Sequence, residues 1–156
     1  MIIREAQQAD IPDMFRIRLA VRENVMSLRE LEEFFGVTPE SIARFLAEEG
    51  KGWMADEEGD AVGFSLGGRK DRCLFALFVL PEFEGRGIGT ALMQAAVDWL
   101  YGQDLSEITI DTEDDPTTRA NALYQRFGAI RIDPVVPGNF RYRLPLPARK
   151  CPLAQA

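Results

Sequence analysis

The chain has 156 residues, a length that suits one domain with a single hydrophobic core. Hydrophobic residues make up 46% and charged residues 28%, which is ordinary for a globular domain and too apolar for a disordered chain. The 18 lysines and arginines against 25 aspartates and glutamates give a net charge of −7, which disfavours nucleic-acid partners. Histidine is absent and the cysteines are Cys73 and Cys151, so a disulfide scaffold, a Cys/His zinc site and histidine-dependent catalysis are excluded.

The sequence also disfavours secretion and membrane insertion. Glu5 and Asp10 precede any apolar core of signal-peptide length, and no later stretch reaches the ~18 apolar residues of a membrane span. We therefore expect a cytoplasmic protein without a membrane partner, in which a reducing compartment keeps the thiols free.

The first half of the chain alternates strand and helix signals. Asp10 and Thr38 are N-cap residues with a proline in the following turn, and Gly50 is a helix end. The predicted elements are a strand over Ile2–Ala6, a helix from Asp10 to Val21, a helix from Thr38 to Gly50, and a hairpin of Gly52–Asp56 and Ala61–Leu66. We expect a loop between the two helices.

The second half contains the most apolar stretch. Cys73–Leu80 is apolar at every position, as a central strand covered on both faces would be. The elements predicted after it are a helix from Gly87 to Gly102 with a stripe of Ile88, Leu92, Ala95, Ala96 and Trp99, a strand around Ile108 and Ile110, a helix from Thr117 to Phe127, and strands Ala129–Ile132 and Phe140–Leu144. The domain is predicted to span residues 1–145, and residues 146–156 to form an irregular tail.

The connection from Leu77 to Leu92 carries the clearest functional signal. Glycines at 85, 87 and 89 let backbone N–H groups converge without obstruction by Cβ atoms, and the helix N-terminus behind them adds a partial positive charge. Together they predict an anion site suited to a pyrophosphate.

Two other nucleotide-binding loop patterns are alternatives for this segment. The mononucleotide pattern GxxxxGK[ST] is excluded because its lysine is missing. The dinucleotide fingerprint shares Gly87 and Gly89, and Asp111 follows at about the 20-residue distance that it expects. Its third glycine is Leu92, however, and such a loop normally follows the first strand of its domain, so a nicotinamide-dependent enzyme stays a minor alternative.

The ordered combination of strand, loop and later helix resembles the GCN5-related N-acetyltransferase (GNAT) family over most of the chain. The loop Glu84–Gly89 matches the family pattern Q/R-x-x-G-x-G/A with Glu84 in the first place, and Arg119–Ala129 resembles A-x-x-LYxxxGF with Ala129 for the final aromatic residue. The resemblance implies an α/β (α+β) acyl-CoA N-acyltransferase fold in one domain. Its sheet would be mixed and mostly antiparallel, with about six to seven strands and about four helices.

The same resemblance implies acetyl-CoA as co-substrate, an amine acceptor, no metal and a homodimer as a candidate assembly. Leu77–Val79 would be a splayed strand that binds pantetheine, and Thr117 stands where relatives carry an asparagine. Amide hydrogen bonds to phosphate, at ~1.5–3 kcal/mol each, should outweigh a like-charge cost from Glu84 of ~1 kcal/mol. The residues assigned to the coenzyme are Leu77, Phe78, Val79, Glu84, Gly85, Arg86, Gly87, Ile88, Gly89, Thr90, Thr117 and Asn121.

Catalysis without histidine needs other proton carriers. An acceptor amine must lose a proton, so a carboxylate acting directly or through water is expected as base, and Glu23, Asp111 and Glu113 are the candidates. Each of them also fits a solvated surface acid. Tyr124 matches the family tyrosine that protonates the leaving thiolate, and the alternative is a core tyrosine.

The acceptor is a primary amine of a small molecule or peptide, by resemblance, and its identity stays open. Arginines 16, 18 and 22 could steer an acidic group or simply face solvent, whereas the net charge favours a cationic acceptor. Phe34 and Phe35 are expected to pack in the core rather than line an acceptor pocket. A non-catalytic acyl-CoA-sensing module on the same fold is the alternative function, because Glu84 and Thr117 depart from the family pattern.

Overall fold

Seven strands form one sheet in the computed structural model, which describes residues 1–103, 107–113, 118–136 and 139–145, without the side chains of 113, 133–136 and 139–140. The sheet order is β1-β2-β3-β4-β5-β7-β6. The strands are β1 (Ile2–Glu5), β2 (Gly50–Glu57), β3 (Asp60–Gly68), β4 (Cys73–Val79), β5 (Glu107–Glu113), β6 (Ile130–Val136) and β7 (Asn139–Pro145).

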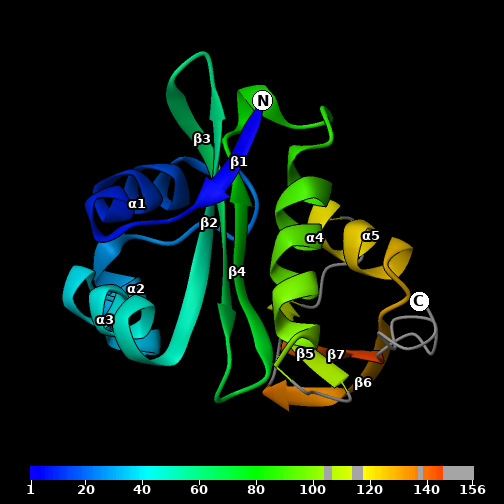
Figure 1. The fold of residues 1–156 in the computed structure, drawn as a ribbon. Coiled ribbons are helices and arrows are strands. Elements are labelled where there is room, and N and C mark those ends of the chain that lie inside the picture. Colours follow the sequence, from blue (N-terminus) through cyan, green and yellow to red (C-terminus); the bar gives the residue numbers. More distant parts are fainter. Residues whose placement is uncertain (104–106, 114–117, 137–138, 146–156) are drawn as a thin grey trace.

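Helices cover both faces of this sheet. The α-helices of the described residues are α1 (Ile11–Ala20), α2 (Leu28–Phe35), α3 (Pro39–Arg44), α4 (Ile88–Tyr101) and α5 (Arg119–Arg126). Figure 1 shows α1, α2 and α3 on one side of β2 to β4 and α4 on the other, with α5 beside α4. Short helical turns at Gln8–Asp10, Phe45–Glu49 and Pro81–Phe83 complete the connections. No helix in the described part of the chain has the length and apolarity needed to cross a membrane.

The pairing of β4 with β5 divides the sheet into two halves. Every other neighbouring pair is antiparallel, whereas β4 and β5 are parallel and share the single register pair Cys73 and Thr109. The Thr109 N–H donates to the Arg72 carbonyl at 2.9 Å at the same point. Because both strands run away from this junction in one direction without further pairing, the sheet opens toward the carboxyl end of β4. The predicted mixed, mostly antiparallel sheet is confirmed.

The expected loop between the first two helices is wrong, because α2 lies there. Ser27 and Glu30 form a reciprocal capping box, in which the Glu30 N–H donates to Ser27 Oγ at 3.1 Å and the Ser27 N–H donates to Glu30 Oε1 at 3.2 Å. Gly36 ends the helix at a φ of +65°. Leu31 is the buried residue of this helix, and Leu28, Leu31 and Phe35 recur at helical spacing. The structure therefore has five α-helices in its described part, where about four were expected.

The expectation that β4 is covered on both faces is confirmed only in part: α1 and α4 lie on its two faces, but two cavities also open onto the strand. Its place in the middle of the sheet is confirmed, and Leu74 is buried. Phe75, however, is 46% exposed, and Ala76 to Val79 are half-buried. Ala76 to Val79 pack against the core and also line the first cavity, so the strand is apolar throughout without being fully buried.

Most of the remaining predictions are confirmed. Thr38 caps α3, which continues through a π-helical turn to Gly50, and Ile108 and Ile110 are the buried positions of β5. Ile88, Leu92 and Ala96 are buried on α4 as predicted, together with Met93, Val97 and Leu100, whereas Ala95 and Trp99 are half-buried. The predicted tail and Cys151 lie outside the described residues.

Candidate active site

The N-terminus of α4 is open to an anion. Its N-cap is Gly87, which has a φ of +83° and no side chain to cap the helix, and the first turn holds no acidic residue. The Ala91 N–H donates to the Gly87 carbonyl at 3.0 Å as the first helical hydrogen bond. The N–H groups of Ile88, Gly89 and Thr90 therefore have no acceptor within the helix, and the helix dipole adds a partial positive charge beside them.

The three loop glycines have different roles. Gly85 and Gly87 adopt φ values of +75° and +83°, which residues with a side chain rarely adopt. Gly89 has ordinary backbone geometry, and a Cβ there would lie 3.6 Å from Leu123 Cδ2 and 3.9 Å from Val79 Cγ2. The turn thus requires two glycines, while the third lies in the helix against α5 and β4.

Glu84, the departure from the family pattern, is paired. Arg119 Nε lies 3.2 Å from Glu84 Oε2, and the Arg119 backbone N–H donates to Glu23 Oε2 at 3.0 Å. These contacts join the α1–α2 connection, the glycine loop and the start of α5. Arg119 is a site residue that the sequence motifs do not mark, and the acid at position 84 is the signal for a cation nearby.

Arg86, the other charged residue of the loop, is engaged on a different side. Its guanidinium carbon lies 5.0 Å from the centroid of the Phe83 ring, and Nη2 donates to the Glu82 carbonyl at 3.4 Å. These contacts hold the side chain against the short helix Pro81–Phe83.

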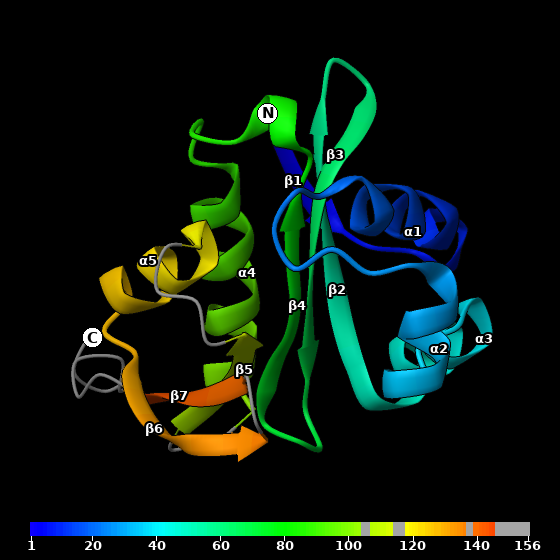
Figure 2. The same cartoon turned by 180° about the vertical axis from the view of Figure 1, so that it is seen from behind.

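A first cavity of about 280 Å³ continues from the open helix end. Its walls come from β4, the glycine loop, the start of α4, the end of β5, α5 and the α1–α2 connection. Figure 2 shows this connection passing across β4 before it reaches α2. Leu77, Phe78 and Val79, which are assigned to the coenzyme, line the cavity together with Gly85, Gly87 and Ile88. The opening between β4 and β5 therefore leads directly to the N–H groups of α4.

Tyr124 lies in the wall of the first cavity and is 6% exposed. Its ring packs edge-on against Tyr142, with 5.8 Å between centroids. Burial, and the nearby Tyr142, raise the pKa of the Tyr124 phenol above its ordinary value of 10.0. The hydroxyl is protonated at neutral pH, as an ordinary phenol also is, and its raised pKa makes it a weaker acid than a solvent-exposed tyrosine.

Asn121, predicted to contact the coenzyme, is turned toward the helix start. It is 1% exposed, and its Nδ2 donates to Thr118 Oγ1 at 2.8 Å. Thr118 also accepts from the Asn121 backbone N–H at 3.3 Å and so caps α5. The observed contact is therefore structural, and Thr117 lies outside the described residues.

The structure brings two of the three candidate bases to the cavity. Glu23 and Asp111 line it, and Asp111 accepts from Arg141 Nε at 2.7 Å and from Nη2 at 3.0 Å. This pairing with Asp111 raises the pKa of the Arg141 guanidinium. The side chain of Glu113 lies outside the described part of the structure. No group of three or more metal-ligating side chains occurs among the described residues.

A second cavity of about 380 Å³ adjoins the first. The two share the lining residues Asn24, Phe75, Ala76, Phe78, Asp111 and Thr112. The second cavity extends between β4, α1 and α2, away from the glycine loop. Two adjoining cavities on either side of an opened sheet can hold a coenzyme and an acceptor with their reacting groups together.

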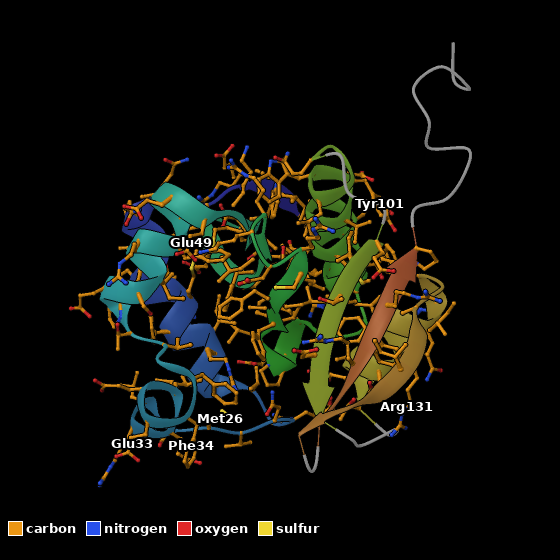
Figure 3. The ribbon with its side chains drawn as sticks, turned by 90° about the horizontal axis from the view of Figure 1, so that it is seen from below. Met26, Glu33, Phe34, Glu49, Tyr101 and Arg131 are labelled. Atoms are coloured by element: carbon orange, nitrogen blue, oxygen red, sulfur yellow. The ribbon has the colours of Figure 1, made fainter. Side chains whose placement is uncertain are left out.

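The expected packing of Phe34 and Phe35 in the core is wrong. Phe34 is 67% exposed and lies at the periphery of the molecule beside Glu33, as Figure 3 shows. Phe35 is 59% exposed and lines the second cavity. The short α2 places one ring outside and the other at the cavity rim, because it buries only Leu31.

Comparison with known proteins agrees with this geometry. The model of the acetyltransferase (GNAT) family matches residues 16–129. An uncharacterised N-acetyltransferase of Archaeoglobus fulgidus is 34% identical over 113 residues, which cover 64% of this chain and 73% of that protein. A mycothiol acetyltransferase of Acidimicrobium ferrooxidans is 31% identical over 57% of this chain, which spans only 33% of that longer protein.

The fold has close counterparts among solved structures. The PaiA N-acetyltransferase of Thermoplasma acidophilum, solved in complex with coenzyme A, superposes with a TM-score of 0.78 at 14% identity, over 93% of this chain and 98% of that one. An identity this low shows the fold alone, whereas the family model covers well over half of the chain. The chain belongs to the GNAT acetyltransferase family.

Proposed function

We propose that the protein transfers the acetyl group of acetyl-CoA directly to a primary amine of a small molecule or peptide, with the catalytic domain spanning residues 1–145. Acetyl transfer as such follows from the family. The observation that carries the proposal is the open N-terminus of α4, which faces a cavity that leads into the gap between β4 and β5.

The chain offers separate groups to each part of the coenzyme. The N–H groups between Gly85 and Thr90 suit a diphosphate, since several converge at a helix end whose first turn holds no acid. Pairing with Arg119 partly offsets the charge of Glu84 beside that position. Along β4, the edge that β5 leaves unpaired offers the backbone of Leu77 to Val79 to the extended pantetheine arm.

Transfer forms a C–N bond and breaks the C–S bond of the thioester. An amine with a lysine-like pKa of ~10.4 is less than ~0.1% deprotonated at neutral pH, so a base must take its proton. Glu23, Asp111 or Glu113 would do this directly or through water, and Glu23 and Asp111 lie on the cavity that the amine must enter. Tyr124 would donate its hydroxyl proton to the departing thiolate, a role that its place in the cavity wall supports.

The proposal is tested by calorimetric titration with acetyl-CoA and by thiol release with a panel of primary amines. We expect saturable binding of acetyl-CoA, no binding of nicotinamide dinucleotides, and thiol release that depends on the amine. Binding without release for any amine would support the sensing module instead. Absence of acetyl-CoA binding would contradict the coenzyme site itself.

A further inference from the structure

Arg18 is a buried cation in the wall of the second cavity. It lies on α1 directly after Ile17, and its side of the helix packs against the sheet, so the residue is only 7% exposed. Its guanidinium carbon lies 4.4 Å from the centroid of the Phe78 ring. Because Phe78 lines both cavities, this contact places the guanidinium beside the passage between them.

The neighbouring arginines, Arg16 and Arg22, do not line either cavity. Arg16 Nε pairs with Asp13 Oδ1 at 2.9 Å, and its Nη2 donates to the Ala61 carbonyl at 2.6 Å. Arg22 is exposed beyond the end of α1. Of the three arginines in this segment, Arg18 is the one that lines the cavity.

The rest of the second cavity is mainly apolar. Its lining includes Met14, Met26, Leu31, Val37, Ile42 and Leu66. Arg18 and Asp111 are the charged side chains among the described lining residues, and Asp111 belongs to the portion shared with the first cavity. The cavity therefore presents a carboxylate at its junction with the coenzyme side, a guanidinium beside the passage, and an apolar interior.

We propose that the acceptor is a small amino acid with an apolar side chain and a free carboxylate, which Arg18 binds; this rests on the proposed function. The planar guanidinium matches a carboxylate with two parallel hydrogen bonds. The amine then lies toward Asp111 and the first cavity, and the side chain enters the apolar interior. A volume of about 380 Å³ is at the lower end of the ~300–1,000 Å³ typical of ligand pockets, which suits one amino acid.

This arrangement discriminates against the other acceptor classes. A peptide N-terminus carries a neutral amide where the amino acid has its carboxylate, so it leaves the guanidinium without an anionic partner from the acceptor. A polyamine brings a second positive charge into the same cavity, where like charges repel strongly because little water screens them.

The experiment compares acceptors matched in shape, at saturating acetyl-CoA. L-leucine, L-leucinamide, 3-methylbutylamine, a leucine-headed peptide amide and spermidine are assayed by thiol release, and the acetylated products are confirmed by mass spectrometry. We expect kcat/KM for leucine to exceed that for leucinamide by about 10- to 100-fold, the range of charge-assisted hydrogen bonds. Amine reactivity cannot produce this preference, because a neighbouring carboxylate favours the charged, unreactive amine.

Substitution of Arg18 assigns the preference to this residue. Arg18→Gln should reduce the leucine-to-leucinamide ratio to within about threefold, and Arg18→Lys should leave an intermediate ratio because it keeps the charge and loses the planar fork. Arg29→Gln is the matched control, since its side chain is 84% exposed on α2 and pairs with Glu33.

Each outcome decides between the hypotheses. Equal rates with leucine and leucinamide in the wild-type protein, faster acetylation of the peptide amide or of spermidine, or a leucine preference that survives in Arg18→Gln would overturn the inference while leaving acetyl transfer intact. The wild-type comparison holds even if Arg18→Gln does not fold. Failure of acetyl-CoA to bind would instead contradict the proposed function.

Discussion

Tyr124 combines a buried ring with a place on the cavity wall, and its substitution separates binding from chemistry. Tyr124→Phe should keep the affinity for acetyl-CoA and lower kcat by about 10²-fold, because a general acid contributes ~10²–10⁴-fold to the rate. Tyr101→Phe is the matched control, since the Tyr101 hydroxyl donates to the Pro145 carbonyl at 3.0 Å away from both cavities. Stopped-flow or steady-state thiol release measures the effect. An unchanged kcat in Tyr124→Phe would remove this residue from the mechanism.

Substitution of Glu84 tests how a single charge beside the glycine loop affects the affinity for acetyl-CoA. Glu84→Gln removes a carboxylate beside the glycine loop and releases Arg119, whose Nη1 lies 3.8 Å from the Cβ position at Gly85. Removing a like charge should strengthen acetyl-CoA binding by about 1 kcal/mol, or roughly fivefold. Glu82→Gln, the same change at an exposed neighbour, should alter Kd less. Weaker binding in Glu84→Gln would show that the carboxylate itself contacts the coenzyme.

At the scale of elements, the start of α4 links backbone conformation to binding. Gly87→Ala forces a side chain into a left-handed conformation and should lower the free energy of unfolding by about 1–2 kcal/mol. Gly59→Ala is a matched control, because Gly59 has a φ of +90° in the β2–β3 turn and, like Gly87, has open space at its Cβ position.

Both variants should show a similar loss in urea unfolding, but only Gly87→Ala should weaken acetyl-CoA binding, since its new methyl group lies at the N–H groups of α4. Equal coenzyme affinity in the two variants would contradict the placement of the diphosphate.

The elements differ in how much of them the sequence predicts. Helix α4 and strand β5 are predictable because their apolar periodicity is strong, and α3 because Thr38 and Pro39 mark its start. Helix α2 is not among the predicted elements, although Ser27 and Glu30 carry the capping-box spacing and Leu31 and Phe35 recur at helical spacing. The partial exposure of β4 cannot be predicted either, because an apolar strand beside a cavity has the same sequence pattern as a strand inside a core.

The candidate site is predictable where a local pattern encodes it. The glycine loop and Tyr124 follow from short motifs, whereas the Glu84–Arg119 pair and the place of Arg18 depend on elements far apart in the chain. Asn121 shows the reverse case: its motif position suggests a coenzyme contact, but its side chain bonds to Thr118, a contact that depends on the cap of α5.

At the scale of the whole molecule, the Cys73 thiol and the Tyr124 phenol predict that the folded protein loses stability at alkaline pH. Both groups are neutral when protonated, and their surroundings disfavour the charged form. Burial, with Asp71 and Asp111 nearby, raises the pKa of the Cys73 thiol from 9.0 to about 11, and burial raises that of Tyr124 as well. Above pH 9 the unfolded chain loses these protons before the folded one does. The folded state therefore binds more protons, and the free energy of unfolding falls as pH rises from about 9 through about 11.

Urea unfolding of the wild-type protein and of Cys73→Ala at pH 8 and pH 10.5 tests this dependence. The variant should be less stable at pH 8 because it loses packing, but its stability should fall less between the two pH values. Parallel losses in both proteins would show that the Cys73 thiol does not contribute.

The central claim is that backbone N–H groups at the start of α4 hold the coenzyme diphosphate, with the pantetheine arm in the gap between β4 and β5. A crystal structure with acetyl-CoA tests it most directly. We expect diphosphate oxygens within hydrogen-bond distance of several N–H groups between Gly85 and Thr90, and the thioester beside Phe78 where the two cavities meet. Acetyl-CoA bound elsewhere, or an empty site at saturating concentration, would contradict the account.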